Sequence, residues 1–134
     1  MVDGRALARA LSAAPPRNPA AYLRDTIASG DAASRQAVAA VATALGRGVA
    51  GLVNALDPHV VTLGGSAADQ LAAAPEALHA AYLNGLMTFR RQSPVPLVAA
   101  ALGSDGPLIG AVETAFAHLL TPAAVAAWVR RSIT

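Results

Sequence analysis

The chain of 134 residues contains no cysteine and no lysine. Without cysteine it has no disulfides, no cysteine-ligated zinc and no thiol catalysis. All ten basic residues are arginines, and the net charge is only +2. The adjacent basic pairs are Arg90-Arg91 and Arg130-Arg131, whereas a nucleic-acid footprint is a denser basic stripe. We therefore expect no direct contact between this segment and nucleic acid.

Charged residues are also scarce, at 13% of the chain against 54% hydrophobic residues. This balance excludes an intrinsically disordered protein and predicts a single domain over residues 1–134. It leaves little charge to cover a surface, so we expect contact with a partner or with a missing segment of the same protein. No signal peptide and no run of about 18 strongly apolar residues is present. We expect a cytoplasmic protein that does not enter the membrane.

Capping residues predict three helices ahead of residue 57. Asp3 caps a helix over 5–11. Asn18 and Pro19 start a helix over 20–28, which Gly30 ends. Asp31 caps the longest helix, over about 32–56. Apolar residues recur along that helix at steps of three and four and predict a buried stripe: Val38, Val41, Leu45, Val49, Leu52 and Leu56.

Two glycines inside the longest helix, Gly48 and Gly51, are unfavourable for helix formation by about 1 kcal/mol each relative to alanine. A glycine kept in a helix commonly marks a place where another backbone passes close by. We therefore predict close packing at these two positions.

The stretch from Asp57 to Ser66 organises the rest of the chain. Asp57 and the following proline end the long helix, because proline disfavours helical geometry in the residue before it. The apolar run 60–63 predicts a short strand buried on both faces. Gly64 and Gly65 form a turn, and Ser66 is expected to cap a helix over 67–73.

The second half repeats this order. A helix restarted at Pro75 is expected to reach Phe89, and residues 95–102 form a second strand. A turn over 103–106 leads to a helix over 107–120 with inward-facing apolar residues, and a last helix to about residue 131 is anchored by Trp128. The two strands should be parallel neighbours joined by a helical crossover, which defines an α/β fold. Since two strands make a marginal sheet, its edges are expected to pair with further strands.

The glycine turn is the leading candidate site. Ligands bind at the carboxyl ends of parallel strands, where helix N-termini attract phosphates and glycine lets a ligand touch the backbone. Gly64, Gly65 and Ser66 are therefore candidate nucleotide contacts, with 103–106 beside them. The alternative is a plain turn between a strand and a helix.

Other candidates favour structural roles. Asp105 could ligate a metal or act as a base, but an aspartate in a turn commonly bonds its own backbone. Asp57 is most simply a turn residue. The three histidines lack metal-ligand spacing, and no carboxylates are paired for acid–base work. We assign no catalytic and no metal-binding residue.

Two longer motifs carry a family resemblance. The segment 45–65, LGRGVAGLVNALDPHVVTLGG, and the segment 101–111, ALGSDGPLIGA, resemble the C-terminal signatures of ROK proteins. The opening VDGRAL at 2–7 is similar to the residues just after the family's zinc-binding cysteine motif. ROK proteins are bacterial sugar kinases and sugar-responsive transcriptional repressors.

The resemblance implies part of an actin-like ATPase fold, which consists of two ribonuclease-H-like domains around a cleft. This chain resembles only the C-terminal portion, helix-rich and with two parallel strands. In kinase members Gly64 and Gly65 would lie against the adenosine side of ATP. The family's phosphate-binding motif, catalytic aspartate, sugar-binding segment and zinc cysteines have no counterpart here.

Three functions stay open. The tail 118–128, HLLTPAAVAAW, resembles the regulator branch and favours the C-terminal part of a sugar-responsive regulator that forms a homodimer. Its sugar effector would bind through upstream residues, and the chain alone would not be catalytic. The alternatives are a fragment of an ATP-dependent sugar kinase and a stand-alone module that self-associates through its strand edges.

Overall fold

The computed structural model describes residues 3–132, except the side chains of residues 104, 131 and 132. Val2 of the opening motif and the side chain of Arg131 thus lie outside the description. The chain divides into two compact units, Met1–Gly103 and Ser104–Thr134. We describe each unit by itself, and the single domain expected over 1–134 stays a prediction.

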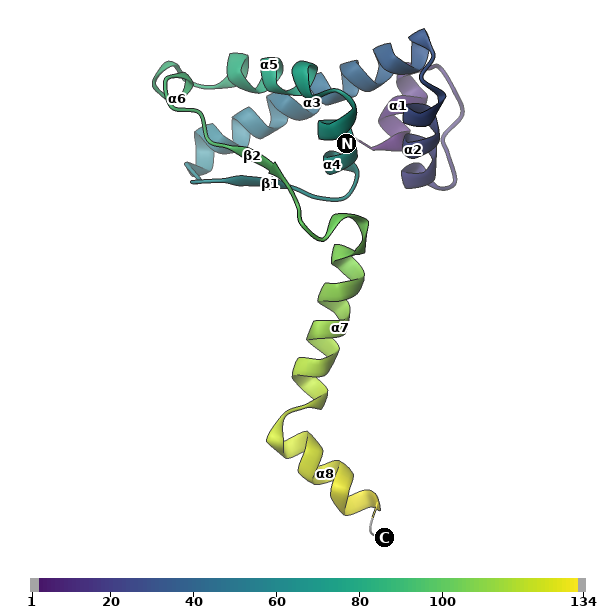
Figure 1. Cartoon of the computed structure of the whole chain (residues 1–134), viewed down its shortest axis with the longest axis vertical. Coiled ribbons are helices and arrows are strands. Elements are labelled where there is room, and N and C mark those ends of the chain that lie inside the picture. The colour runs from purple at the N-terminus through teal and green to yellow at the C-terminus, as the bar shows by residue number, and fades with distance from the viewer. Residues whose placement is uncertain (1–2, 133–134) are drawn as a thin grey trace. The chain divides into compact units, whose positions relative to one another are not determined.

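The first unit alternates helices with two short strands (Figure 1). In chain order its elements are α1 (Gly4–Ala10), α2 (Pro19–Ser29), α3 (Ala32–Leu56), β1 (Val61–Leu63), α4 (Ser66–Ala73), α5 (Pro75–Gly85), α6 (Thr88–Arg91) and β2 (Leu97–Ala99). A short 3₁₀ turn, η1 (Gly103–Asp105), leads into the second unit, which consists of α7 (Gly106–Leu119) and α8 (Pro122–Ser132).

Side-chain caps fix the starts of the first three helices, as predicted. The carboxylate of Asp3 accepts a hydrogen bond from the Arg5 N–H at 3.0 Å. The Asn18 side chain accepts from the Ala21 N–H at 3.1 Å, and that of Asp31 accepts from the Ser34 N–H at 2.9 Å. These bonds satisfy N–H groups that lack an acceptor within the helix.

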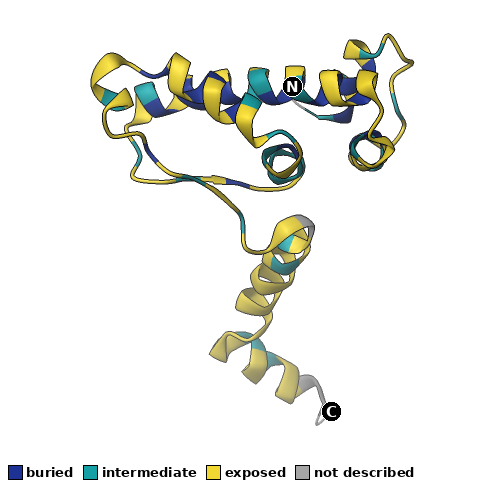
Figure 2. Cartoon of the chain, turned by 45° about the horizontal axis from the view of Figure 1, so that its top comes forward, coloured by how far each residue is buried: buried dark blue, intermediate teal, exposed yellow. Residues whose placement is uncertain are grey.

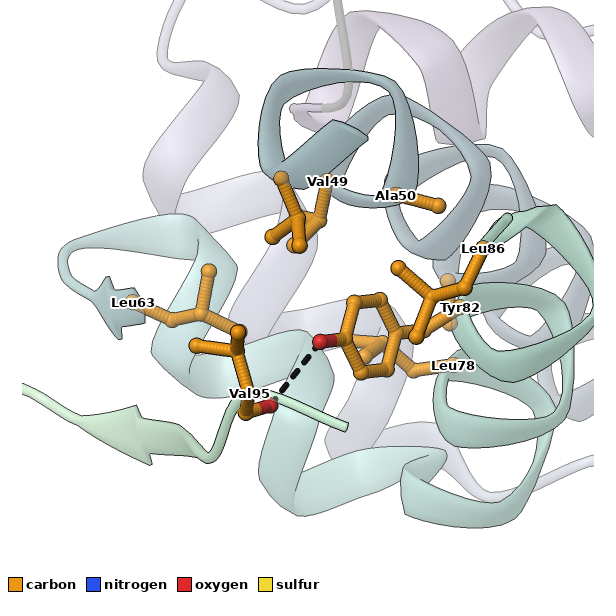
Figure 3. Packing of buried hydrophobic residues seen from close by; sticks show 9 residues of the cluster. Val49, Ala50, Leu63, Leu78, Tyr82, Leu86 and Val95 are labelled. Atoms are coloured by element: carbon orange, nitrogen blue, oxygen red, sulfur yellow. Dashed lines mark hydrogen bonds between the residues drawn. The ribbon is translucent and has the colours of Figure 1, made fainter. Parts of the chain in front are cut away.

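The core of the first unit lies in two clusters along α3. Its first half packs with α1 and α2 through Leu7, Leu23 and Val38. Its second half packs with α5 and the strands through Val49, Leu78 and Tyr82 (Figure 3). The long helix is therefore the common support of both halves of the unit.

The predicted stripe of α3 is wrong at its C-terminal end. Leu52 and Leu56 are 61% and 73% exposed. The face that α3 buries against α5 carries smaller residues at steps of four, four and three: Ala42, Gly46, Ala50 and Val53. Small side chains are buried here because the two helices lie too close for leucine.

The prediction of close packing at Gly48 and Gly51 is also wrong. A Cβ added at either position would meet nothing within 4 Å. The close contacts are at Gly46, whose added Cβ would lie 2.3 Å from the Leu78 carbonyl oxygen, and at Gly85, whose Cβ would lie 2.7 Å from that of Ala50. Glycine marks a tight helix crossing here, but at Gly46, two residues before Gly48 and on the other side of α3.

The helix predicted to reach Phe89 ends earlier, at Gly85. The side chain of Asn54, on α3, forms hydrogen bonds to the backbone on both sides of the point where α5 ends. Its Nδ2 donates to the Gly85 carbonyl at 2.9 Å, and its Oδ1 accepts from the Met87 N–H at 3.1 Å. A contact over more than thirty residues of sequence ends the helix, so the local pattern gave no sign of it.

Strands β1 and β2 pair in parallel, with Val61 opposite Leu97 and Leu63 opposite Ala99. The crossover through α4, α5 and α6 confirms the predicted connection. The second strand is shorter than predicted, and burial on both faces is wrong, because Thr62 and Val98 are exposed. Among the described residues of the first unit, the helices therefore cover only one face of the sheet.

Tyr82 is a core residue of the first unit. It is 2% exposed, and its hydroxyl donates to the Val95 carbonyl at 2.9 Å (Figure 3). Burial raises the pKa of this hydroxyl above its usual value. The pair ties α5 to the segment that enters β2.

The second unit has no buried residue in α7 (Figure 2). Its predicted inward residues are exposed, at 67% for Leu108 and 54% for Phe116, and Trp128 of α8 is 69% exposed. Two helices alone supply no second layer to cover an apolar stripe, so the inward orientation of these residues stays a prediction. Thr121 caps the start of α8, since its Oγ1 accepts from the Ala124 N–H at 3.2 Å.

Helix α3 is long and apolar enough to cross a membrane, contrary to expectation. Half of its most apolar window is nevertheless buried inside the first unit, where it packs against α5. Core helices of soluble proteins share this composition, so the length and hydropathy of α3 are explained by its place in the core.

The Asp31 cap makes stability depend on pH. Bonds from the Ser34 N–H, the Ser34 hydroxyl and the Ser29 hydroxyl lower the pKa of Asp31 from 3.8 to about 2. Because the pKa of Asp31 is lower in the folded than in the unfolded protein, the ionised side chain stabilises the fold at pH values above 3.8. This stabilisation is lost as the pH falls from 3.8 through about 2. We expect Asp31→Asn, which keeps an acceptor without a charge, to remove that component.

Urea unfolding of both proteins between pH 2 and pH 5 measures the difference. The wild type should lose its advantage over Asp31→Asn across the acidic part of this range. An advantage that stays constant with pH would contradict the assigned role of Asp31.

Candidate functional site

The glycine turn lies at the carboxyl end of β1, as predicted. Gly65 adopts φ 55° and ψ −136°, a conformation that only glycine occupies readily. Ser66 does not cap α4 as expected. It is the first helical residue, Gly65 is the N-cap, and no side chain caps this end. The chain changes direction at Gly65 alone, so α4 begins at Ser66, one residue before the predicted start at residue 67.

Gly64 has a different role from Gly65. An added Cβ at Gly64 would lie 3.5 Å from the Cβ of Ala100, an ordinary contact, whereas nothing lies within 4 Å of one at Gly65. Both glycines are exposed. The backbone conformation therefore requires glycine at Gly65 but not at Gly64. The open space beside Gly65 is wide enough for a planar ligand group to contact the backbone.

The end of β2 adjoins this turn. The Ala100 N–H donates to the Leu63 carbonyl at 2.8 Å, and the Gly103 N–H donates to the Ala100 carbonyl at 3.2 Å. The carboxyl ends of both strands thus meet at one edge, where ligands of parallel sheets bind. Residues from Ser104 onward belong to the second unit, so their expected place beside the glycine turn stays a prediction.

The N–H groups of Ala67 and Ala68 in the first turn of α4 are already engaged by the glycine turn itself. Ala67 and Ala68 donate to the Gly64 and Gly65 carbonyls at 3.2 and 3.0 Å. A carboxylate, Asp69, already occupies this first turn, where it complements the helix dipole. Its charge disfavours a phosphate at the same place, so the turn suits an uncharged ring better than an anion.

The other sequence candidates are not gathered at this turn. Asp57 ends α3 in the left-handed region at φ 49° and forms an ion pair with Arg90. Asp105 is exposed and makes no capping bond at α7. His79 and His118 bond backbone carbonyls of their own helices at 2.8 Å. Within residues 3–132, no three acidic, cysteine or histidine side chains cluster as metal ligands.

Sequence reasoning missed two features of the first unit. The Asp57–Arg90 pair joins residues from α3 and α6, and neither position carries a local signal for it. A surface cavity of about 500 Å³ lies between α2, α3 and the junction of α4 with α5. None of its lining residues belongs to the glycine turn. Alanines from separate segments form much of its wall, so no motif marked it.

Comparison with known families decides the relationship of the chain. A model of the ROK family matches residues 1–117. The chain belongs to the ROK family. No curated protein and no solved structure matches it in corresponding searches. The resemblance noted from the two signatures is thereby confirmed.

Membership of the ROK family implies the actin-like ATPase fold. The helix-rich first unit with two parallel strands is consistent with that fold. The family match covers α1 to most of α7, whereas residues 118–134, with all of α8, lie beyond it. The family includes proteins with different activities, so membership leaves the function of this chain to be argued separately.

Proposed function

We propose that this chain is the C-terminal part of the effector domain of a ROK-family, sugar-responsive transcriptional regulator. It completes an effector domain with a partial actin-like ATPase fold and helps to form a cytoplasmic homodimer. The sugar effector binds through residues outside this segment. The segment itself neither catalyses a reaction nor contacts nucleic acid or membrane.

The observation that carries this proposal is the helical extension beyond the family match. The match ends at residue 117, yet the chain continues into α8, which Thr121 starts with a side-chain cap. A capped, amphipathic helix at this place resembles the tail of regulator members. Its exposed Val125 and Trp128 supply apolar area for contact with another chain.

The chemistry of the glycine turn agrees with a role in binding rather than catalysis. Phosphoryl transfer needs a positioned base or metal ions beside the transferred group. Near the turn, Asp69 is placed at the helix N-terminus, whereas Asp57 lies ahead of the other end of β1 and is engaged by Arg90. Neither carboxylate is placed as a base toward the exposed glycines.

A sugar kinase fragment is the alternative, and the open backbone at Gly64 and Gly65 favours it. In that case ATP would bind with its adenosine side on the glycines and its phosphates away from Asp69. Amide chemical shifts of Gly64, Gly65 and Ser66 during an ATP titration test this contact. Shifts confined to those residues would favour the kinase branch.

Two measurements test the regulator proposal. Mapping the peptides that precede residue 1 in the native protein should reveal a helix-turn-helix; a kinase-type phosphate motif, or a native protein that starts at residue 1, would contradict it. The chain incubated with ATP and aldohexoses should form no ADP above background. Sugar phosphorylation by the chain alone would overturn its non-catalytic role.

Self-association is tested by sedimentation of the chain. A concentration-dependent dimer agrees with the homodimer and with the third possibility, a stand-alone module. Because only the regulator needs upstream DNA-binding residues, the peptide mapping separates these two. A stable monomer with a cooperative thermal transition would contradict the need for a partner.

A further inference from the structure

The surface cavity between α2, α3 and the α4–α5 junction has the dimensions of a small-molecule site. Its volume is about 500 Å³, and such sites commonly span about 300–1,000 Å³. Its walls are apolar, with Ile27 from α2, Val38 and Ala39 from α3, and Ala73 and Ala77 from the other side. The walls therefore fit an apolar body.

Two charged side chains of opposite sign line the same cavity from different elements. Arg35 comes from α3, and Glu76 comes from the first turn of α5. The Arg35 guanidinium donates one hydrogen bond to the Gly30 carbonyl, itself part of the lining, which holds Arg35 at the cavity. A guanidinium has five N–H donors, so donors remain for a ligand.

Arg35 and Glu76 do not neutralise each other. The ion pairs recorded among residues 3–132 are Asp3 with Arg5 and Asp57 with Arg90. Arg35 and Glu76 are thus more than 4.0 Å apart at their charged atoms. Because both side chains line the same cavity, a ligand that carries both charges finds a partner of opposite sign for each of them there.

We propose that this cavity binds a small amphipathic zwitterion, such as an α-amino acid with a large apolar side chain. Its carboxylate pairs with Arg35, because guanidinium and carboxylate match in a bidentate geometry. Its ammonium group pairs with Glu76, and its side chain lies against Ile27 and Val38. The site is separate from the glycine turn, so its existence does not depend on the proposed regulator function.

The test compares three probes that share a phenyl ring. Phenylalanine carries both charges, 3-phenylpropionate only the carboxylate and phenethylamine only the ammonium group. Each is titrated into the chain while backbone amide shifts are recorded. Phenylalanine should shift Ala39, Ala73 and Ala77, and each single-charge probe should bind about tenfold more weakly, the effect of one lost charged hydrogen bond.

Charge variants then assign each end of the ligand. Arg35→Gln should abolish the advantage of phenylalanine over phenethylamine, and Glu76→Gln should abolish its advantage over 3-phenylpropionate. Arg24→Gln is the matched control. Arg24 lines a neighbouring hollow of about 330 Å³ and not the larger cavity. This control should bind all three probes as the wild type does.

Filling the cavity supplies an independent check. Ala39→Phe should weaken phenylalanine binding at least tenfold while thermal unfolding stays cooperative. The inference would be overturned by unchanged amide shifts at the lining residues, by equal binding of the three probes, or by a loss with Arg24→Gln that Arg35→Gln does not reproduce. It would also be overturned if a folded Ala39→Phe variant bound as the wild type does.

Discussion

Replacing Gly46 by alanine is expected to lower the free energy of unfolding by about 3 kcal/mol, at the upper end of overpacking effects. The new Cβ would lie 2.3 Å from the Leu78 carbonyl oxygen and 3.0 Å from the Tyr82 nitrogen. Both are backbone atoms of α5 and cannot rotate away as a side chain would. The two helices must therefore separate at their closest crossing.

Gly48→Ala is the matched control, because it makes the same chemical change two residues further along α3. Nothing lies within 4 Å of its added Cβ. It should raise the free energy of unfolding by up to about 1 kcal/mol through helix propensity. Urea unfolding of both variants measures the contrast. A Gly46→Ala variant as stable as Gly48→Ala would show that α3 and α5 do not cross at Gly46.

Truncating Leu78 to alanine is expected to lower the free energy of unfolding by about 2–5 kcal/mol. Leu78 is 0% exposed and lies in the cluster with Val49 and Tyr82. Its loss removes apolar burial and leaves a cavity that the neighbouring helices fill only in part. The effect should appear as a lower urea midpoint with an unchanged slope.

Leu83→Ala is the control on the same helix. Leu83 is 39% exposed, so its truncation removes less buried surface. It should lower the free energy of unfolding by less than about 1.5 kcal/mol, the value for a small loss of burial. Equal losses from the two variants would contradict the orientation of α5 against α3.

Local chemistry made much of the first unit predictable. Asp3, Asn18 and Asp31 begin helices because their side chains accept from N–H groups within three residues. Gly30, at φ 61°, ends α2 for an equally local reason. The parallel strand pair follows from two apolar runs joined by a helical segment too long for a hairpin.

The buried face of α3 was readable only in part. Ala42, Gly46 and Ala50 recur every four residues and mark the side that meets α5. The larger leucines of the same helix suggested another face, although Leu52 and Leu56 are exposed. Side-chain size misled because the contact with α5 is a close backbone approach, which selects small residues rather than bulky ones.

Of the two candidate sites, the glycine turn was predictable from the sequence and the cavity was not. Gly64 and Gly65 follow a strand and precede a helix, so sequence order alone placed them at the sheet edge. Whether nucleotide binds there is a question that their position leaves to experiment. The cavity beside Arg35 and Glu76 brings together residues 26–39 and 73–77, two stretches distant in sequence, and several of its lining residues are alanines. Only the packing of α2, α3 and α5 creates it.

The most direct test of the regulator proposal is chromatin immunoprecipitation of the native protein, with an antibody against this chain, from cells grown with and without sugars. Discrete promoter sites should be enriched, and their occupancy should change with one sugar. Binding to DNA in the cell would come from residues outside this segment. The absence of discrete sites under every growth condition would contradict the proposed regulator.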